Sequence, residues 1–203
     1  DSGLVLPPRV APYQVVIVPI PPRKGDWNEQ VLPKAREVMA TLRGAGIRVH
    51  LDDRDHQQTG FKYADWEMRG VPLRLELGPK DIEKDQCVLV RRDTREKSSV
   101  PLAGLAGAAR ERLDRMQADL LEKARLFVKE KTTRVGSYAE FKEAMATRRG
   151  FILAGWNGDP AVEARIKEET KATVRVIPLD GGAEAPCIVT GQPGREVWFA
   201  QAY

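Results

Sequence analysis

A short β-branched run near the start of the chain constrains the fold more than any other feature. Residues 14–20 read Gln-Val-Val-Ile-Val-Pro-Ile, and prolines stand on both sides of them. A continuous apolar run of this length is typical of a strand that is buried on both faces of a sheet. The sequence therefore predicts the first core strand of the fold here.

The segments that follow this run indicate a parallel crossover. From Glu29 to Leu42 the apolar residues fall on one helical stripe, and Gly44 provides a stop signal. Residues 47–51 then have the composition of a second strand. Strand, helix and strand in this order predict a right-handed βαβ unit with two parallel strands.

Residues 71–78 contain the clearest alternation in the chain. Three leucines alternate there with Arg74 and Glu76. We therefore expect the leucines to face a core and the two charged side chains to face outward. A helix over residues 59–69 is expected before this strand, and a short strand over residues 87–90 after it.

The rest of the chain indicates a second, smaller domain. A long apolar stripe over residues 107–131 predicts a connecting helix, and Ser137 with Glu140 forms a capping box that begins another helix. The predicted fold class is α/β, with helices packed on a mixed sheet, followed by a small α+β domain. The predicted division assigns a linker to residues 1–12, the first domain to 13–115, the connecting helix to 116–135 and the second domain to 136–203.

Composition excludes several classes of protein. Of the 203 residues 31% are charged and the net charge is +4, which is ordinary for a globular protein and favours polyanionic partners only slightly. The two cysteines lie far apart in the sequence, which favours a reducing compartment, so we expect the cytoplasm. No membrane segment or signal peptide is expected. The chain does not begin with Met, which suggests a piece of a longer protein.

No motif of a self-contained catalytic site is found, whether a phosphate-binding loop, a dinucleotide fingerprint, a nucleophile elbow or a zinc-protease motif. His50 and His56 flank an acidic cluster at residues 52–55, which could form a metal site or an acid–base pair. The favoured interpretation is structural. A strand end leads into a polar loop, and Arg54 pairs with the aspartates.

A mostly basic series runs from the end of the second predicted helix into the following loops. Charge counting alone favours a solvated surface. The rigid turn at residues 78–81, however, would place Lys80 beside the strand face that presents Arg74. Such a surface could bind unstacked bases, since arginine and lysine donate to guanine O6 and N7 and a glutamate accepts from N1 and N2. The series consists of Glu67, Arg74, Lys80, Arg91, Arg92, Arg95 and Lys97.

Several short blocks, occurring in the right order, resemble the prolyl-tRNA synthetase family downstream of its catalytic domain. The extra C-terminal unit ending in tyrosine is similar to that of the archaeal and eukaryote-like type. The similarity covers nearly the whole chain. The blocks are Leu-Val-Leu-Pro-Pro-Arg-Val-Ala-Pro at 4–12, Leu-Asp-Asp-Arg at 51–54, Trp-Glu at 66–67, Gly-Val-Pro at 70–72, Glu-Leu-Gly-Pro-Lys-Asp at 76–81, Ile-Lys-Glu-Glu-Thr at 166–170 and Phe-Ala-Gln-Ala-Tyr at 199–203.

The resemblance implies an anticodon-binding domain and a C-terminal domain of a class II ligase that joins proline to tRNA(Pro). The catalytic domain would lie upstream of Asp1, so no catalytic residue is assigned here and this portion alone is expected to be inactive. ATP and Mg would act in the parent enzyme, which is expected to be a homodimer. The positions that match the family's guanine-reading residues are Glu67, Arg74, Lys80 and Lys97.

Two further expectations come from the same resemblance. Many members hold a structural zinc with four cysteines, but the corresponding positions here are Asn157, Val162, Cys187 and Thr190. A single thiol is too few for such a site, so zinc is not expected. In the family the chain end approaches the active site, which implies an active-site-directed role for the carboxylate of Tyr203.

Two alternatives remain open at this point. The chain could be a free-standing adaptor that uses an anticodon-binding fold to bind a protein partner, because fold alone does not fix function. It could also be a small-molecule enzyme that uses the cluster from Asp52 to His56, although no nucleophile or phosphate loop accompanies that cluster.

Overall fold

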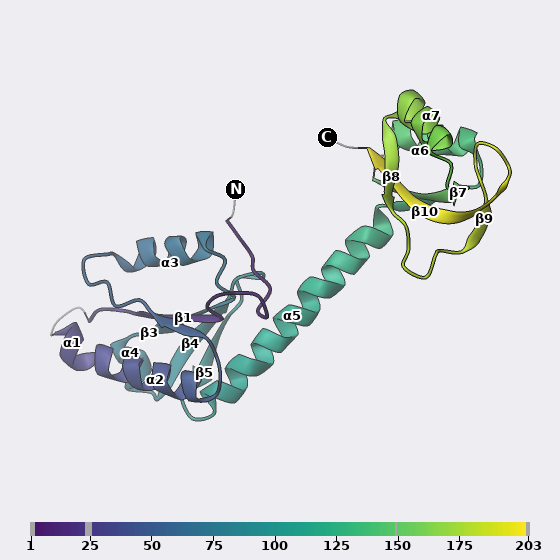
Figure 1. Cartoon of the computed structure of the whole chain (residues 1–203). Helices are drawn as coiled ribbons and strands as arrows, with labels where there is room; N and C mark the ends of the chain where they lie inside the picture. The colour runs from purple at the N-terminus through teal and green to yellow at the C-terminus, as the bar shows by residue number, and fades with distance from the viewer. Residues whose placement is uncertain (1–2, 23–25, 149, 202–203) are drawn as a thin grey trace. The chain divides into compact units, whose positions relative to one another are not determined.

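The computed structural model describes residues 3–22, 26–148 and 150–201. The chain forms two compact units, Asp1–Leu121 and Glu122–Tyr203 (Figure 1). Among the described residues, no helix combines the length and the apolar character that crossing a membrane requires.

The first unit contains a five-stranded mixed sheet in the order β2-β1-β3-β4-β5. Strand β1 pairs in parallel with β2 and with β3, whereas β3–β4 and β4–β5 are antiparallel. Helix α2 connects β1 to β2, so the predicted strand–helix–strand unit with parallel strands is confirmed. The strands are β1 (Val15–Pro19), β2 (Val49–Leu51), β3 (Leu73–Leu77), β4 (Gln86–Arg91) and β5 (Lys97–Pro101).

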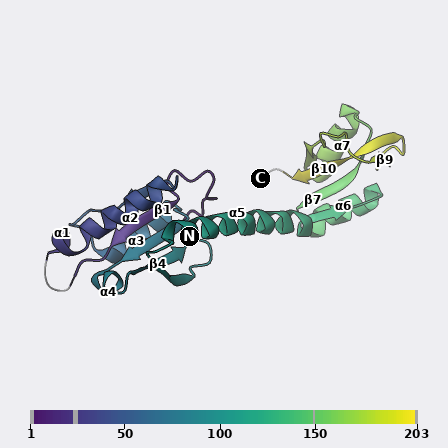
Figure 2. The same ribbon diagram turned by 90° about the horizontal axis from the view of Figure 1, so that it is seen from below.

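One face of this sheet carries the main core. Leu73, Leu75 and Leu77 are fully buried in it, as the alternation predicts. Each buried leucine contributes about 1.5–3 kcal/mol relative to an exposed one. The other core residues come from the neighbouring strands, from α2 (Leu32–Gly44) and from the first half of α5 (Leu105–Glu130). Two short helices, α1 (Trp27–Gln30) and α4 (Pro79–Ile82), lie beside this core (Figure 2).

The opposite face of the sheet is covered as well. Helix α3 (Thr59–Met68) lies over it, and Trp66 packs with Val16 and Val18 in a smaller apolar cluster. Figure 1 shows α3 across the sheet from α2. The expectation that Arg74 and Glu76 face solvent is therefore wrong, since they are only 8% and 7% exposed. The alternation places them on the correct face, but α3 covers that face.

Helix α5 begins inside the first unit and ends in the second. Its early turns contribute Leu105, Ala109, Leu113 and Met116 to buried positions. The division between the two units falls within this helix, between Leu121 and Glu122. Its bounds agree to within two residues with the helix predicted over residues 107–131.

The second unit is built on a sheet in the order β6-β7-β10-β8, with β9 paired to β10. Strands β6 and β7 are parallel and the remaining pairs are antiparallel. Phe141, Ile166 and Phe199 lie at the centre of its core. The elements are β6 (Thr132–Arg134), α6 (Tyr138–Thr147), β7 (Phe151–Trp156), α7 (Pro160–Thr170), β8 (Ala172–Val176), β9 (Glu184–Pro186) and β10 (Pro193–Gln201).

Local signals begin both helices of the second unit. The Ser137 hydroxyl accepts a hydrogen bond from the backbone N–H of Glu140 at 3.3 Å. Asp159 caps α7 by accepting from the N–H of Ala161 at 2.8 Å, and Pro160 fills the first helical position. Each such cap stabilises a helix by about 1 kcal/mol. The helix start predicted at Ser137 is confirmed.

Candidate functional site

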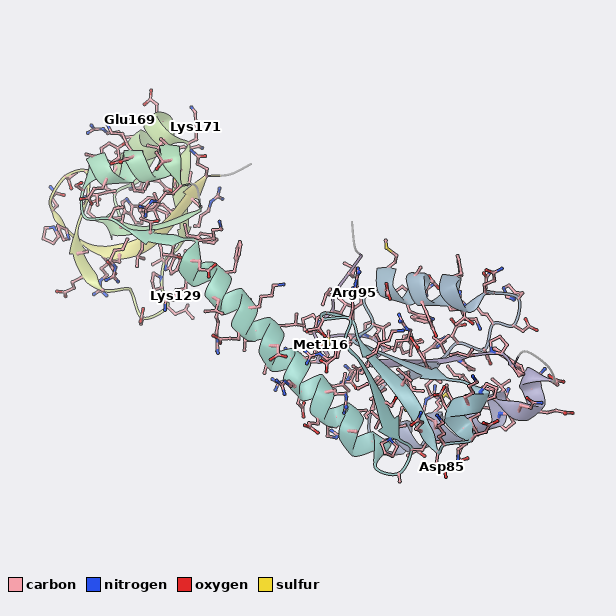
Figure 3. All side chains as sticks on the ribbon, turned by 180° about the vertical axis from the view of Figure 1, so that it is seen from behind. Asp85, Arg95, Met116, Lys129, Glu169 and Lys171 are labelled. Carbon is pink, nitrogen blue, oxygen red and sulfur yellow. The ribbon has the colours of Figure 1, made fainter. Side chains whose placement is uncertain are left out.

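The first unit has a pocket of about 220 Å³ between the end of α3, the sheet and the β4–β5 hairpin. Glu67, Arg74 and Lys97, three of the four predicted site residues, line it. Figure 3 labels Arg95, which also lines it. The remaining lining residues are Val16, Trp66, Val71, Val90, Arg91 and Arg92.

Arg74 is held by two carboxylates and an aromatic ring. Its Nη1 donates to Glu67 Oε1 at 2.6 Å, while Nε and Nη2 donate to Glu76 Oε1 at 3.1 and 3.0 Å. The guanidinium also lies over the ring of Tyr63, 3.9 Å from its centroid. The side chain is only 10% exposed. Arg74 is therefore not a free cation on an open platform, but a fixed group on the pocket wall. Three of its five N–H groups donate to the two carboxylates, which leaves two for other acceptors.

Glu67 offers the most accessible carboxylate of this cluster. Its side chain is 38% exposed, and only Oε1 is engaged by Arg74. Within the described part of the chain, no hydrogen bond to its Oε2 is found. The backbone carbonyl of Glu67 accepts from Arg92 Nε at 3.1 Å, which fixes the end of α3. The pocket therefore presents an oriented carboxylate with one open acceptor edge.

Lys97 and Lys80 occupy different surroundings. Lys97 Nζ lies 3.5 Å from Glu76 Oε1, and its side chain is 58% exposed at the pocket. Lys80 is exposed on α4 and does not line the pocket. Strand β3 separates the two sites: it rises about 3.3 Å per residue, so its end, where α4 begins, lies roughly 10 Å from Arg74. Lys80 therefore does not share the pocket that Arg74 lines.

Two residues of this cluster escaped the sequence interpretation. Glu76 was expected in solvent, yet it is the second carboxylate on Arg74. Tyr63 stacks on Arg74, and burial together with the nearby charge of Glu76 raises the pKa of its hydroxyl. One signal for Tyr63 was available, because it precedes Glu67 by four residues on the same helix, and residues at that spacing share a face.

The acidic cluster after β2 is a structural network. Asp52 is buried and accepts from Arg54 Nε and Nη2 at 2.8 and 2.6 Å, so the predicted pairing is confirmed. Burial opposes ionisation of Asp52, but the bonds from Arg54 and Trp66 outweigh it and lower the pKa to about 2. His50 packs against the rings of Tyr13 and Trp66, with centroid distances of 5.0 and 4.8 Å.

The positions considered for zinc also come into view in the second unit. Val162 lies in the apolar core, and Cys187 is 2% exposed. Burial alone would raise the pKa of the Cys187 thiol. Hydrogen bonds from the Thr190 hydroxyl and from the backbone N–H groups of Thr190, Val189 and Asn157 outweigh burial, so the pKa is lowered overall. Over the described ranges, no group of three or more His, Cys, Asp or Glu is placed to hold a metal ion. Tyr203 lies outside the described residues.

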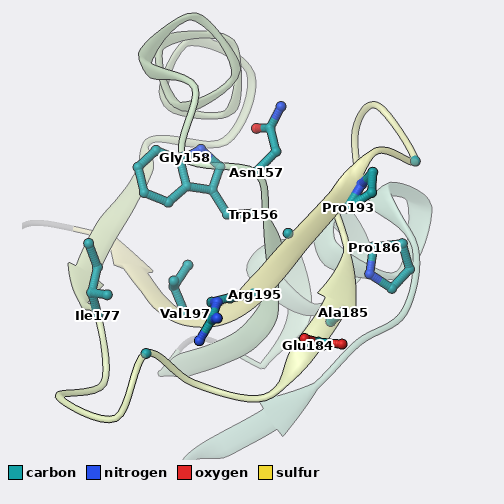
Figure 4. A pocket seen from close by; sticks show the side chains of 13 residues that line it. Trp156, Asn157, Gly158, Ile177, Glu184, Ala185, Pro186, Pro193, Arg195 and Val197 are labelled. Atoms are coloured by element: carbon teal, nitrogen blue, oxygen red, sulfur yellow. The ribbon is translucent and has the colours of Figure 1, made fainter.

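A larger hollow of about 890 Å³ lies in the second unit. Figure 4 shows Trp156, Ile177, Val197 and Arg195 around it. Most of its other lining residues are glycines and prolines. Of the four positions considered for zinc, only Asn157 lines it.

Residues 14–112 match the family described as "Anticodon binding domain", and residues 138–203 match "Prolyl-tRNA synthetase, C-terminal". The Clostridioides difficile protein "Proline--tRNA ligase 2" is 49% identical over 180 residues, which cover 89% of this chain and 37% of that protein. The "Proline--tRNA ligase" proteins of Chlorobium luteolum and Porphyromonas gingivalis are 45% and 46% identical over the whole chain, and 43% and 41% of their own lengths are covered.

These relatives are bacterial, so a C-terminal domain of this kind is not confined to archaea and eukaryotes. The chain spans about two fifths of the length of the relatives named. The two family matches occur in sequence order, and the relatives are 45–49% identical over nearly all of the chain, so both findings point to the same family. The chain belongs to the prolyl-tRNA synthetase family and contains its anticodon-binding domain and its C-terminal domain.

Proposed function

We propose that this chain binds tRNA(Pro) by accepting an anticodon guanine in the pocket beside Glu67 and Arg74. A catalytic domain elsewhere in the full-length protein would then join proline to that tRNA using ATP and Mg. The observation that carries this proposal is the 2.6 Å bond from Arg74 Nη1 to Glu67 Oε1, which leaves the other carboxylate edge open to the pocket.

The chemistry of a carboxylate favours guanine over the other bases. Guanine presents two donors, N1–H and the N2 amino group, on its Watson–Crick edge, and an ionised glutamate is an acceptor only. Adenine presents the lone pair of N1 there, which repels the carboxylate. The bases of a single-stranded RNA loop can be splayed out so that such an edge enters a pocket.

Arg74 would act in two ways. It fixes the orientation and the negative charge of Glu67, because the guanidinium cannot lose its proton. Its remaining N–H groups, two of five after the three bonds to Glu67 and Glu76, would donate to guanine O6. Lys97, which is exposed at the pocket, would add a cation near O6 or N7.

Lys80 would contact a different part of the anticodon loop. It is exposed on α4, beyond the end of β3 away from Arg74. A neighbouring nucleotide of the same loop would meet it there. The four family positions would thus be divided between one base in the pocket and a second contact outside it.

The rest of the proposal concerns the full-length protein. It would be a homodimer in the cytoplasm, and the free, buried thiols of Cys87 and Cys187 are consistent with a reducing compartment. Zinc would not be needed, since Asn157, Val162 and Thr190 supply no thiolate or imidazole for such a site. Tyr203 would direct its carboxylate toward the catalytic domain.

Equilibrium binding to stem-loop RNAs tests the proposal. The wild-type chain is expected to prefer a proline anticodon loop over one with adenine in place of the guanine, by about 1–3 kcal/mol. It is also expected to bind more weakly as salt rises, by roughly 0.7 log units per log unit of salt for each phosphate neutralised. Equal affinity for both loops would rule out base reading. Stable assembly with a protein partner and no RNA affinity would favour the adaptor alternative.

A further inference from the structure

The hairpin between β4 and β5 holds an arginine in a backbone conformation that suits glycine. Arg95 has a φ of 61°, in the left-handed region. Its backbone N–H donates to the carbonyl of Arg91 at 3.0 Å, and the Arg91 N–H donates to the carbonyl of Glu96 at 3.0 Å. Most side chains are disfavoured at such a φ, whereas glycine adopts it at no steric cost.

The four arginines that line the pocket differ in what they bind. Arg74 is committed to Glu67 and Glu76, and Arg91 to Asp93 at 2.7 Å and Asp119 at 2.8 Å. Arg92 holds the carbonyl of Glu67. The exposed side chain of Arg95, in contrast, makes no hydrogen bond or ion pair with any residue that the structure describes.

This combination gives the side chain of Arg95 no internal role. The side chain fills no core position and pairs with no carboxylate of the described residues. The backbone conformation at Arg95 costs more free energy than it would for a glycine. Five N–H donors stand in solvent at the edge of a pocket whose inner wall carries Glu67 and Arg74. A ligand that enters the pocket would pass these donors.

We propose that Arg95 binds a phosphate of the RNA strand whose base enters the pocket. This inference rests on the proposed function and adds to it a contact that reads no sequence. Each nucleotide carries a phosphate close to its base, so a base held inside leaves a phosphate at the rim. A planar guanidinium binds phosphate oxygens through two parallel N–H bonds. Phosphate contacts set the position of the strand, and base contacts set its identity.

If Arg95 binds phosphate, replacing it should affect the stability of the protein and its affinity for RNA in different ways. Replacing Arg95 with glycine relieves the backbone, so the urea midpoint of unfolding should not fall and is expected to rise. The same change removes a phosphate contact, so affinity for the stem-loop should fall about five- to tenfold. The slope of log affinity against log salt should become shallower by about 0.7. The preference for guanine over adenine should be unchanged.

The chain offers a matched control in Lys171, which is also labelled in Figure 3. Lys171 is an exposed cation with a φ of 62° at the C-cap of α7, and it does not line the pocket. Lys171→Gly therefore makes the same change in charge and relieves a similar backbone. It should leave affinity and salt slope unchanged. Arg95→Lys keeps the charge and should retain part of the affinity.

The experiment measures stem-loop binding of the wild-type chain and these three variants over a range of salt concentrations. Guanine-selective binding by the wild type with no loss in Arg95→Gly would overturn this inference and leave the proposed function standing. Unselective binding that Arg95→Gly still weakens would support the phosphate contact and contradict base reading. An equal loss in Lys171→Gly, or no binding by the wild type, would overturn the inference as well.

Discussion

The indole Nε1 of Trp66 donates a 2.7 Å hydrogen bond to Oδ2 of Asp52, and this bond joins α3 to the end of β2. The same carboxylate accepts from Arg54, which also reaches Asp65 on α3 at 2.9 Å. Lys62 Nζ donates to the backbone carbonyl of Asp52 at 3.2 Å. Two residues of α3 thus bind Asp52 directly and a third, Asp65, is linked to it through Arg54. The same helix carries Glu67 to the pocket.

Removing the carboxylate of Asp52 should destabilise the first unit strongly. Asp52→Ala removes the hydrogen-bond acceptor of the Trp66 N–H and the carboxylate that lies 3.9 Å from the buried Lys62 Nζ, and the loss of one member of a buried ionic network costs about 3–5 kcal/mol. Urea unfolding monitored by tryptophan fluorescence measures the change. The control is Asp53→Ala, an exposed neighbour, which should change stability by less than about 0.5 kcal/mol. Equal effects of the two substitutions would contradict the network.

The same group makes stability depend on acid. Bonds from Arg54 and Trp66 outweigh burial and lower the pKa of Asp52 from 3.8 to about 2. A depressed pKa contributes stability that is present above pH 3.8 and is lost as the pH falls toward 2, by about 2 kcal/mol. The difference in unfolding free energy between wild type and Asp52→Asn should therefore shrink over this window. A constant difference from pH 5 to pH 2 would contradict the assignment.

Lys80 and the pocket should contribute separately to RNA binding. Lys80→Ala is expected to weaken binding of the stem-loop about fivefold, because an exposed cation contributes on the order of 1 kcal/mol beside RNA. The preference for guanine at the pocket position should not change, since Lys80 does not line the pocket. Titration of both loops with this variant measures the two quantities. A loss of guanine preference in Lys80→Ala would show that Lys80 contacts the RNA base that enters the pocket, and would contradict this separation.

Metal removal should leave the second unit intact. Its core is apolar, with Phe141, Ile166 and Phe199 at the centre, and three of the four positions considered for zinc carry no metal-binding side chain suited to that ion. Treatment with a strong chelator should therefore not shift the thermal midpoint. Elemental analysis of purified protein should find far less than one zinc per chain. About one zinc per chain, with a lower midpoint after chelation, would contradict this expectation.

Much of the first sheet could be predicted because its local and long-range signals agree. The run at residues 14–20 and the leucines of β3 have the periodicity of their final environment. Strand β5 was not predicted, because Lys-Ser-Ser-Val-Pro has a single buried apolar residue, Val100. It pairs with β4 through backbone bonds at the sheet edge, which an apolar pattern does not record.

The pocket could be predicted only in part. Sequence similarity identified Glu67 and Arg74, and the alternation placed Arg74 on the correct face of β3. The burial of Arg74 could not be predicted from the sequence, because charged residues that alternate with apolar ones in a strand normally indicate a solvent-exposed face. The ion pair between Glu67 and Arg74 depends on the position of α3, because Glu67 lies on that helix. The hydrogen bond from Trp66 to Asp52 holds the helix in place. Such a tertiary contact leaves no local pattern.

A double-mutant cycle between Glu67 and guanine gives the most direct measurement of how this pocket works. The wild-type chain and Glu67→Gln are each titrated with a loop that carries guanine and with one that carries inosine, which lacks the N2 amino group. Arg74 would hold the amide oxygen of the glutamine, so the amide NH₂ would face the base. The exposed Glu83→Gln serves as the control.

If Glu67 accepts from N2, the substitution costs more binding energy with guanine than with inosine. The expected coupling is about 1 kcal/mol or more for Glu67→Gln, and close to zero for Glu83→Gln. The same loss of affinity for both loops in Glu67→Gln would show that the carboxylate does not accept from N2, and would contradict the proposed reading of the N2 amino group in the pocket.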